Sequence, residues 1–137
     1  MGHLTRYTPW GKPLNALGRH LLIELHDCDR DALDDIDLIR DTLVEAADRL
    51  QSSILDVSTH KFQPIGCTAI VMIAESHLSI HTWPEHGYAA MDIFTCSQTM
   101  QPADVVGFIS ARLQSKNVQS LEVNRGILPL VRAGRPG

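Results

Sequence analysis

The sequence lacks any long apolar run. The most apolar stretch surrounds residues 70–74 and is far shorter than the ~20 residues that a membrane-spanning helix needs. The chain also begins without a basic segment followed by an apolar one, so a secretory signal is not expected. These absences predict a cytoplasmic protein that does not associate with membranes.

An excess of basic charge is absent as well. The 137 residues include 12 Lys and Arg against 16 Asp and Glu, a formal net charge of −4. Proteins that follow nucleic-acid phosphates need clustered positive charge, so we expect no nucleic-acid partner. The three cysteines, an odd number at irregular spacing, argue against a disulfide framework and favour reduced thiols. The length is that of one domain, residues 1–137, and no repeat or linker divides it.

The apolar residues follow two alternating periods. Apolar or alternating stretches predict strands at residues 19–26, 53–62, 67–74, 77–82, 88–96 and 118–123. Helical spacing predicts helices at residues 34–50 and 102–116, the second beginning at Pro102. The order β-α-β-β-β-β-α-β with short links predicts an α+β fold, a two-layer sandwich whose mostly antiparallel sheet has its helices on one face.

Several aspartates crowd the start of the first predicted helix. Asp27, Asp29 and Asp31 have the spacing of the first three ligands of a calcium-binding loop. The loop pattern then requires Gly and Glu where this chain has Ala32 and Leu38. Carboxylates at a helix N-terminus also cap free N–H groups and offset the helix dipole, and we expect this structural role here.

The seven histidines raise the question of a metal site. His77 and His81 are four residues apart, which on a helix would bring both rings to one metal. The surrounding alternation is that of a strand, where residues four apart lie about 13 Å from each other. Zinc–nitrogen bonds of ~2.1 Å do not bridge that distance, so we expect no metal site.

Glu75, Ser76 and His77 lie at a predicted turn between two apolar strands. A serine hydroxyl in a tight turn can attack the carbonyl of the preceding residue, an N→O acyl shift in which a histidine acts as base. The same residues also suit an ordinary hairpin. Spacing alone does not decide between the two interpretations.

Residues 74–96, AESHLSIHTWPEHGYAAMDIFTC, closely resemble the bacterial and archaeal form of S-adenosylmethionine decarboxylase, a pyruvoyl-dependent enzyme made as a proenzyme. The family pattern is approximately ESHLTIHTWPExGYAAvDvFTC. The resemblance spans roughly residues 17–127 and includes LGRHLLIEL at residues 17–25.

The resemblance implies that the chain cuts itself between Glu75 and Ser76. The products are a β chain, residues 1–75, and an α chain, residues 76–137. Ser76 is converted into a pyruvoyl group, which forms a Schiff base with the substrate amine and serves as the electron sink for loss of CO2. Neither a metal nor pyridoxal phosphate is implied.

The resemblance also implies roles for three side chains. His81 matches the residue that serves processing, and Cys96 matches the acid that protonates the carbanion after decarboxylation. The family commonly has Ser, as an assistant to processing, where this chain has Thr68. A hydroxyl is kept, so we expect cleavage to occur.

Three further residues are implied to bind substrate. Phe62 and Trp83 match aromatics that contact the adenine and the sulfonium region, where a cation over an aromatic face gains ~0.5–2 kcal/mol. Glu85 matches the carboxylate that binds the ribose hydroxyls. The implied reaction converts S-adenosylmethionine into S-adenosylmethioninamine, the aminopropyl donor for spermidine biosynthesis.

Short members of this family are homodimers of αβ protomers in which two sheets meet and both protomers shape each active site, so the resemblance implies a homodimer. Two other interpretations remain open. One is a pyruvoyl decarboxylase acting on ornithine or arginine, because Glu85 could also hold a basic side chain. The other is a non-enzymatic homologue that regulates a true decarboxylase, against which the intact Glu75, Ser76, His81 and Cys96 argue.

Overall fold

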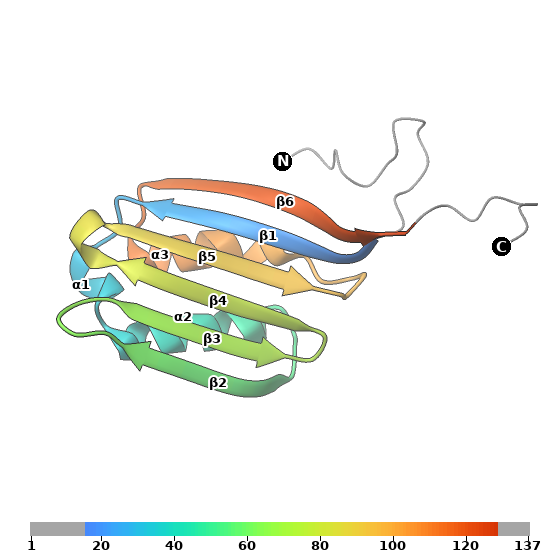
Figure 1. The fold of residues 1–137 in the computed structure, drawn as a ribbon, viewed down its shortest axis with the longest axis horizontal. Coiled ribbons are helices and arrows are strands. Elements are labelled where there is room, and N and C mark those ends of the chain that lie inside the picture. The colour runs from blue at the N-terminus through green and yellow to red at the C-terminus, as the bar shows by residue number, and fades with distance from the viewer. Residues whose placement is uncertain (1–15, 129–137) are drawn as a thin grey trace, which may run out of the picture.

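Six strands form one antiparallel sheet in the order β2-β3-β4-β5-β1-β6. This computed structural model describes residues 16–128; residues 1–12 and 132–137, which the sequence predicts to be loose termini, lie outside that range. The strands are β1 Ala16–His26, β2 Ile54–Lys61, β3 Cys67–Ile73, β4 Ser76–Trp83, β5 Tyr88–Thr95 and β6 Asn117–Ile127. Figure 1 shows the sheet in front and the helices behind it, which confirms the predicted two-layer α+β sandwich.

Three α-helices and two short 3-10 helices connect the strands. They are α1 Arg30–Leu33, α2 Ile36–Arg49, η1 Pro84–His86, η2 Pro102–Val105 and α3 Val106–Leu113. The helix predicted at residues 34–50 is α2. The helix predicted at residues 102–116 is divided into η2 and α3, and α3 ends before Gln114, whose φ of 54° is in the left-handed region. Within the described range, none of the helices combines the length and the hydropathy that crossing a bilayer requires.

Aspartates cap the first two helices, and for α2 the sequence predicts this role. The Asp29 carboxylate accepts a hydrogen bond from the Ala32 N–H at 2.9 Å, and the Asp35 carboxylate accepts one from the Leu38 N–H at 3.1 Å. Each bond satisfies an N–H that has no partner inside its helix. The short α1 was not predicted, because only one helical turn separates its capping residue, Asp29, from Asp35, which caps α2.

The hydrophobic core lies between the sheet and the helices. Alternate residues of each central strand point into it, and burying each large side chain contributes roughly 1.5–3 kcal/mol. The largest fully buried side chains are Ile23, Leu25, Leu33, Ile39, Leu43, Val71, Ile73, Leu78, Ile80, Ile93, Ile109 and Leu113.

The other side of the sheet is uncovered, and we call it the open face: the residues of the strands that point away from the helices. Leu22 and Leu121 are register partners on this face, and they are 40% and 62% exposed. Ile70 and Met72 on β3 are 41% and 51% exposed. The open face therefore presents apolar side chains to its surroundings, whereas the helices bury the opposite face of the four inner strands.

Candidate active site

The turn between β3 and β4 is strained at one residue. Ile73 and Ser76 are register partners, so Ala74 and Glu75 alone form the hairpin turn. Glu75 has a φ of 65°, in the left-handed region, which costs an ordinary L residue roughly 1–2 kcal/mol. The peptide bond that follows Glu75 therefore starts from a strained backbone.

The hydroxyl of Ser76 is held beside β5. Its Oγ donates a hydrogen bond to Oγ1 of Thr95 at 2.8 Å, and the Ser97 N–H donates to the same Thr95 oxygen at 3.0 Å. Thr95 is fully buried, so its own position is well determined. The sequence analysis did not single out Thr95. Its position in the alternation of β5, on the same side as the buried Met91 and Ile93, was the only indication that its side chain is buried.

Cys96 lies one residue past the end of β5, which is shorter by that residue than the predicted strand. Its N–H donates a hydrogen bond to the Glu75 carbonyl at 3.0 Å, and its thiol is exposed. The Arg19 guanidinium donates to the backbone carbonyls of Ser97, at 3.4 Å, and Met100, which holds the segment after Cys96. The structure thus brings Cys96 to the Glu75 carbonyl. Ser76 directly follows Glu75 in the sequence.

Thr68 and His81 form a second group. They are register partners on β3 and β4, and Oγ1 of Thr68 lies 2.9 Å from Nδ1 of His81. The predicted processing histidine therefore does contact the hydroxyl at position 68. Threonine in place of serine preserves that contact.

The three predicted substrate-binding residues lie at the same end of the sheet as His81. Trp83 ends β4, is 42% exposed, and stacks on Tyr88 with ring centroids 5.4 Å apart. Glu85 is exposed within η1. Phe62 directly follows β2, is 47% exposed, and its N–H donates to the Gly66 carbonyl at 2.8 Å.

The loop that carries Phe62 is tied to the helices by Asp34. This carboxylate accepts hydrogen bonds from the Gly66 N–H and from Nζ of Lys61, each at 2.8 Å. The bonds from Lys61 and Gly66 hold the pKa of Asp34 below its usual value. The sequence analysis missed this anchor, because it joins residues far apart in the chain.

The two groups lie at opposite ends of β4. Ser76 begins the strand and His81 follows five residues later, which at 3.3 Å per residue places them roughly 16 Å apart. The distance from Ser76 to Trp83 is roughly 23 Å by the same rule. Within one chain, therefore, His81, Thr68 and the substrate-binding residues do not reach Ser76.

Asp92 on β5 is the centre of a network that the sequence analysis did not predict. Its carboxylate accepts hydrogen bonds from the Ser79 hydroxyl, from Nε2 of His20 at 2.5 Å, and from Nε2 of His77 at 3.1 Å. Burial raises the pKa of Asp92, but the hydrogen bonds from Ser79, His20 and His77 outweigh it and hold the pKa below its usual value. Arg125 lies 2.9 Å from Nδ1 of His20, and we call these five residues the Asp92 network.

His20, His77 and Asp92 are close enough to be considered as metal ligands, since one ligand atom from each lies within 4.8 Å of the others. A histidine that binds a metal through Nε2 normally donates its Nδ1–H to an acceptor. Here Nδ1 of His20 faces the Arg125 guanidinium, which only donates. The arrangement therefore fits hydrogen bonds to a carboxylate better than a metal centre.

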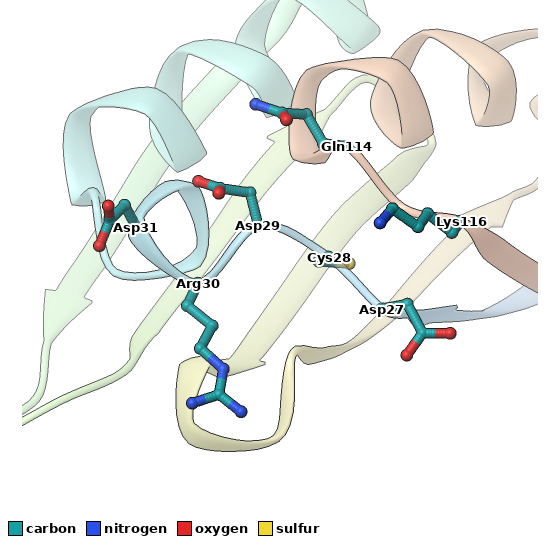
Figure 2. A pocket seen from close by; sticks show the side chains of 7 residues that line it. All are labelled: Asp27, Cys28, Asp29, Arg30, Asp31, Gln114 and Lys116. Atoms are coloured by element: carbon teal, nitrogen blue, oxygen red, sulfur yellow. The ribbon is translucent and has the colours of Figure 1, made fainter.

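A cavity of about 480 Å³ lies between the start of α1 and the end of α3, and Figure 2 shows the side chains around it. Asp29 is committed to capping α1, and burial raises the pKa of the Cys28 thiol. None of the predicted site residues lines the cavity. Its lining consists of Asp27, Cys28, Asp29, Arg30, Asp31, Gln114 and Lys116.

Comparisons with known proteins find a family that matches most of the chain. The family model described as S-adenosylmethionine decarboxylase matches residues 19–126. A protein of Caldanaerobacter subterraneus subsp. tengcongensis named S-adenosylmethionine decarboxylase proenzyme is 47% identical over 114 residues, which cover 83% of this chain and 92% of that protein. A protein of the same name from Clostridium kluyveri is 42% identical over 118 residues, which cover 86% and 94%.

A solved structure is also similar. The crystal structure of the adenosylmethionine decarboxylase from Aquifex aeolicus superposes with a TM-score of 0.78 at 33% identity, covering 86% of this chain and 98% of that one. The sequence match and the fold match each extend over most of the chain. The chain belongs to the S-adenosylmethionine decarboxylase family.

Proposed function

We propose that this protein is a self-cleaving, pyruvoyl-dependent decarboxylase that converts S-adenosylmethionine into S-adenosylmethioninamine. One observation carries the proposal: a strained Glu75 has its carbonyl bonded to the Cys96 N–H and is followed directly by Ser76. A strained peptide with a polarised carbonyl and a serine directly after it suits an N→O acyl shift, and it lies at the motif that resembles the family pattern.

The geometry favours cleavage between Glu75 and Ser76. Oγ of Ser76 bonds to the carbonyl carbon of Glu75, the C–N bond breaks, and the Ser76 nitrogen takes the hydroxyl proton. The Cys96 N–H stabilises the negative charge that develops on the Glu75 oxygen, and release of the left-handed φ lowers the barrier further. Elimination then frees the Glu75 carboxylate, and hydrolysis of the remaining enamine releases ammonia.

The residues present fit a pyruvoyl group, since Ser76 supplies its three carbons and becomes the first residue of the α chain. When formed, this group supplies an electrophilic carbonyl that binds the substrate amine and accepts the electron pair left by CO2. Cys96 is exposed, its N–H bonds to the Glu75 carbonyl directly before this chain end, and its thiol donates the proton that replaces CO2. Neither a metal nor pyridoxal phosphate has a part in this scheme.

A second protomer completes the site. The Thr68–His81 pair lies on the open face at the far end of β4, and the exposed Leu22, Ile70 and Met72 make that face suitable for burial. In a two-fold dimer whose open faces meet with opposed strand directions, the end of one β4 lies over the start of the other. His81 of one protomer then serves the Ser76 of its partner.

The same dimer would bring the substrate-binding residues to the pyruvoyl end. Trp83 and Phe62 offer exposed aromatic faces to the sulfonium and adenine, and Glu85 offers a carboxylate to the ribose hydroxyls. The proposed unit is therefore a homodimer of αβ protomers in the cytoplasm.

The mass of the purified protein under denaturing conditions tests the cleavage. We expect one fragment of 75 residues and one of 62 residues with a blocked N-terminus, and a single full-length chain for Ser76→Ala. A full-length mass for the unaltered chain after long incubation would contradict the proposal. Release of labelled CO2 from S-adenosylmethionine, but not from ornithine or arginine, tests the substrate.

A further inference from the structure

The Asp92 network includes His77, the second residue after the proposed cut. His77 is the second residue of β4, and its Nε2 lies 3.1 Å from Oδ2 of Asp92. Asp92 lies on the neighbouring strand, two register positions away from His77's own partner Phe94. The network therefore joins the start of β4 to the middle of β5 through a side chain.

Arg125 determines the direction of the hydrogen bond between His20 and Asp92. A guanidinium only donates, so Nδ1 of His20 accepts from Arg125 and Nε2 of His20 carries the proton that goes to Asp92. Because Oδ2 of Asp92 is only an acceptor when ionised, Nε2 of His77 donates as well. The carboxylate is the common acceptor on which both rings depend.

Packing fixes the His77 ring in a second way. The ring stacks on Phe94 with centroids 5.8 Å apart and an interplanar angle of 23°. The His20 ring is nearly perpendicular to it, with centroids 6.2 Å apart. Phe94 in turn lies over Gly18, where a Cβ would approach the ring to 2.7 Å. The absence of a side chain at Gly18 thus leaves the space that Phe94 occupies.

We propose that Asp92 is a positioning residue that, through His77, holds the start of β4 in place after the chain has been cut. This inference rests on the proposed self-cleavage. Before the cut, the hairpin turn at Glu75 ties Ser76 to β3; afterwards Ser76 is a chain end, and strand ends open easily. The pyruvoyl group is attached to the backbone nitrogen of His77, so anchoring the His77 ring limits movement of the reacting group.

The consequence for turnover follows from geometry. A displacement of about 1 Å at a reacting centre can cost on the order of 100-fold in rate, whereas a partial loosening costs less. Asp92→Asn keeps the shape of the side chain but removes its charge. We expect kcat to fall about tenfold and KM for S-adenosylmethionine to change less than about threefold, because Asp92 does not contact the proposed substrate-binding residues.

Hydrogen–deuterium exchange of the peptide covering residues 76–80 tests the proposal without reference to activity. The exchange rate with Asp92→Asn is compared with the rate with the native Asp92 in two proteins. One is the cleaved protein, and the other is the uncleavable Ser76→Ala protein. We expect exchange about tenfold faster in the cleaved background and changed less than about twofold in the uncleaved one. Equal acceleration in both backgrounds, or none in the cleaved one, would overturn the proposal.

A matched control lies on the same face of the sheet. The Glu24 carboxylate on β1 accepts from the Tyr88 hydroxyl at 2.7 Å, and burial together with Glu24 raises the pKa of Tyr88 to about 12. Glu24→Gln makes the same chemical change away from His77, and exchange of residues 76–80 should not respond to it. A response as large as that of Asp92→Asn would show a general effect of lost charge.

A second pair of variants removes the link from the other side. His77→Ala should reproduce the loss in kcat, and His77→Gln, which retains an N–H donor, should recover part of it. Fragment masses are recorded for every variant, so a failure of self-cleavage in the unaltered chain is seen separately from a failure of this inference. An uncut Asp92→Asn chain would also overturn it, because the role of Asp92 would then precede the cut.

Discussion

The two ends of β4 contribute different kinds of chemistry. At its start, backbone geometry dominates: Glu75 is left-handed, its carbonyl is bonded to the Cys96 N–H, and Ser76 is held by Thr95. At its end, exposed side chains dominate, with His81 and Trp83 on the open face. In the proposed function, the start of β4 is where a bond breaks, and its end supplies a base and binds a ligand.

The distance between these ends is the reason why we propose that a second protomer completes the site. About 16 Å separates Ser76 from His81 along one strand, and no side chain spans that length. The open face, with its exposed Leu22 and Leu121, offers the surface through which a second copy would supply the missing half. The comparison therefore predicts different phenotypes for substitutions at the two ends.

The largest effect on turnover is expected at the start of the strand. Cys96→Ala removes the thiol but keeps the N–H that bonds to Glu75, so the chain should still be cut. Loss of a general acid typically costs 10²–10⁴-fold, and we expect kcat to fall by at least about 100-fold. Fragment masses and CO2 release measure the two effects separately.

A buried thiol provides the control for Cys96. Cys28 lies away from the site and is 7% exposed, so Cys28→Ala should retain cleavage and turnover. Normal turnover in Cys96→Ala would remove the proton-donor role. An uncut Cys96→Ala chain would mean that the thiol, and not only the backbone, serves processing.

A smaller effect is expected at the other end. Glu85→Gln loses a charge-assisted hydrogen bond worth roughly 1.5 kcal/mol, so KM for S-adenosylmethionine should rise about tenfold with little change in kcat. His86→Ala, in the same 3-10 helix, should leave KM unchanged. Steady-state kinetics would contradict the binding role if the two variants behaved alike.

Local patterns were sufficient to predict most of the fold. Strict alternation over residues 77–82 and 88–96 identified the two central strands, and the aspartates before α2 identified its cap. The error at Cys96 is a boundary effect: the sequence alternation continues for one residue past Thr95, the last residue of β5 that pairs with β4. The start of α3 was misjudged because Pro102 permits either a 3-10 or an α-helical turn.

The candidate site was less accessible from the sequence. The motif identified Ser76, His81 and Cys96 together. Their closeness in sequence did not indicate that His81 lies five residues further along an extended strand than Ser76, and therefore far from Ser76 and Cys96. The network around Asp92 depends on the pairing of β5 with both β4 and β1, which local periodicity does not specify. Long-range register is what the structure adds.

Sharing of the site between protomers is the central claim, and co-expression of two inactive chains tests it most directly. Ser76→Ala has no nucleophile, and His81→Ala has no processing base, so neither is expected to be cut alone. In a mixed dimer, Ser76 of the His81→Ala chain would meet the intact His81 of its partner. We predict that about half of the His81→Ala chains are then cut, as random pairing in a two-fold dimer requires. If co-expression leaves every His81→Ala chain at full length, His81 does not act across the dimer and the account is wrong.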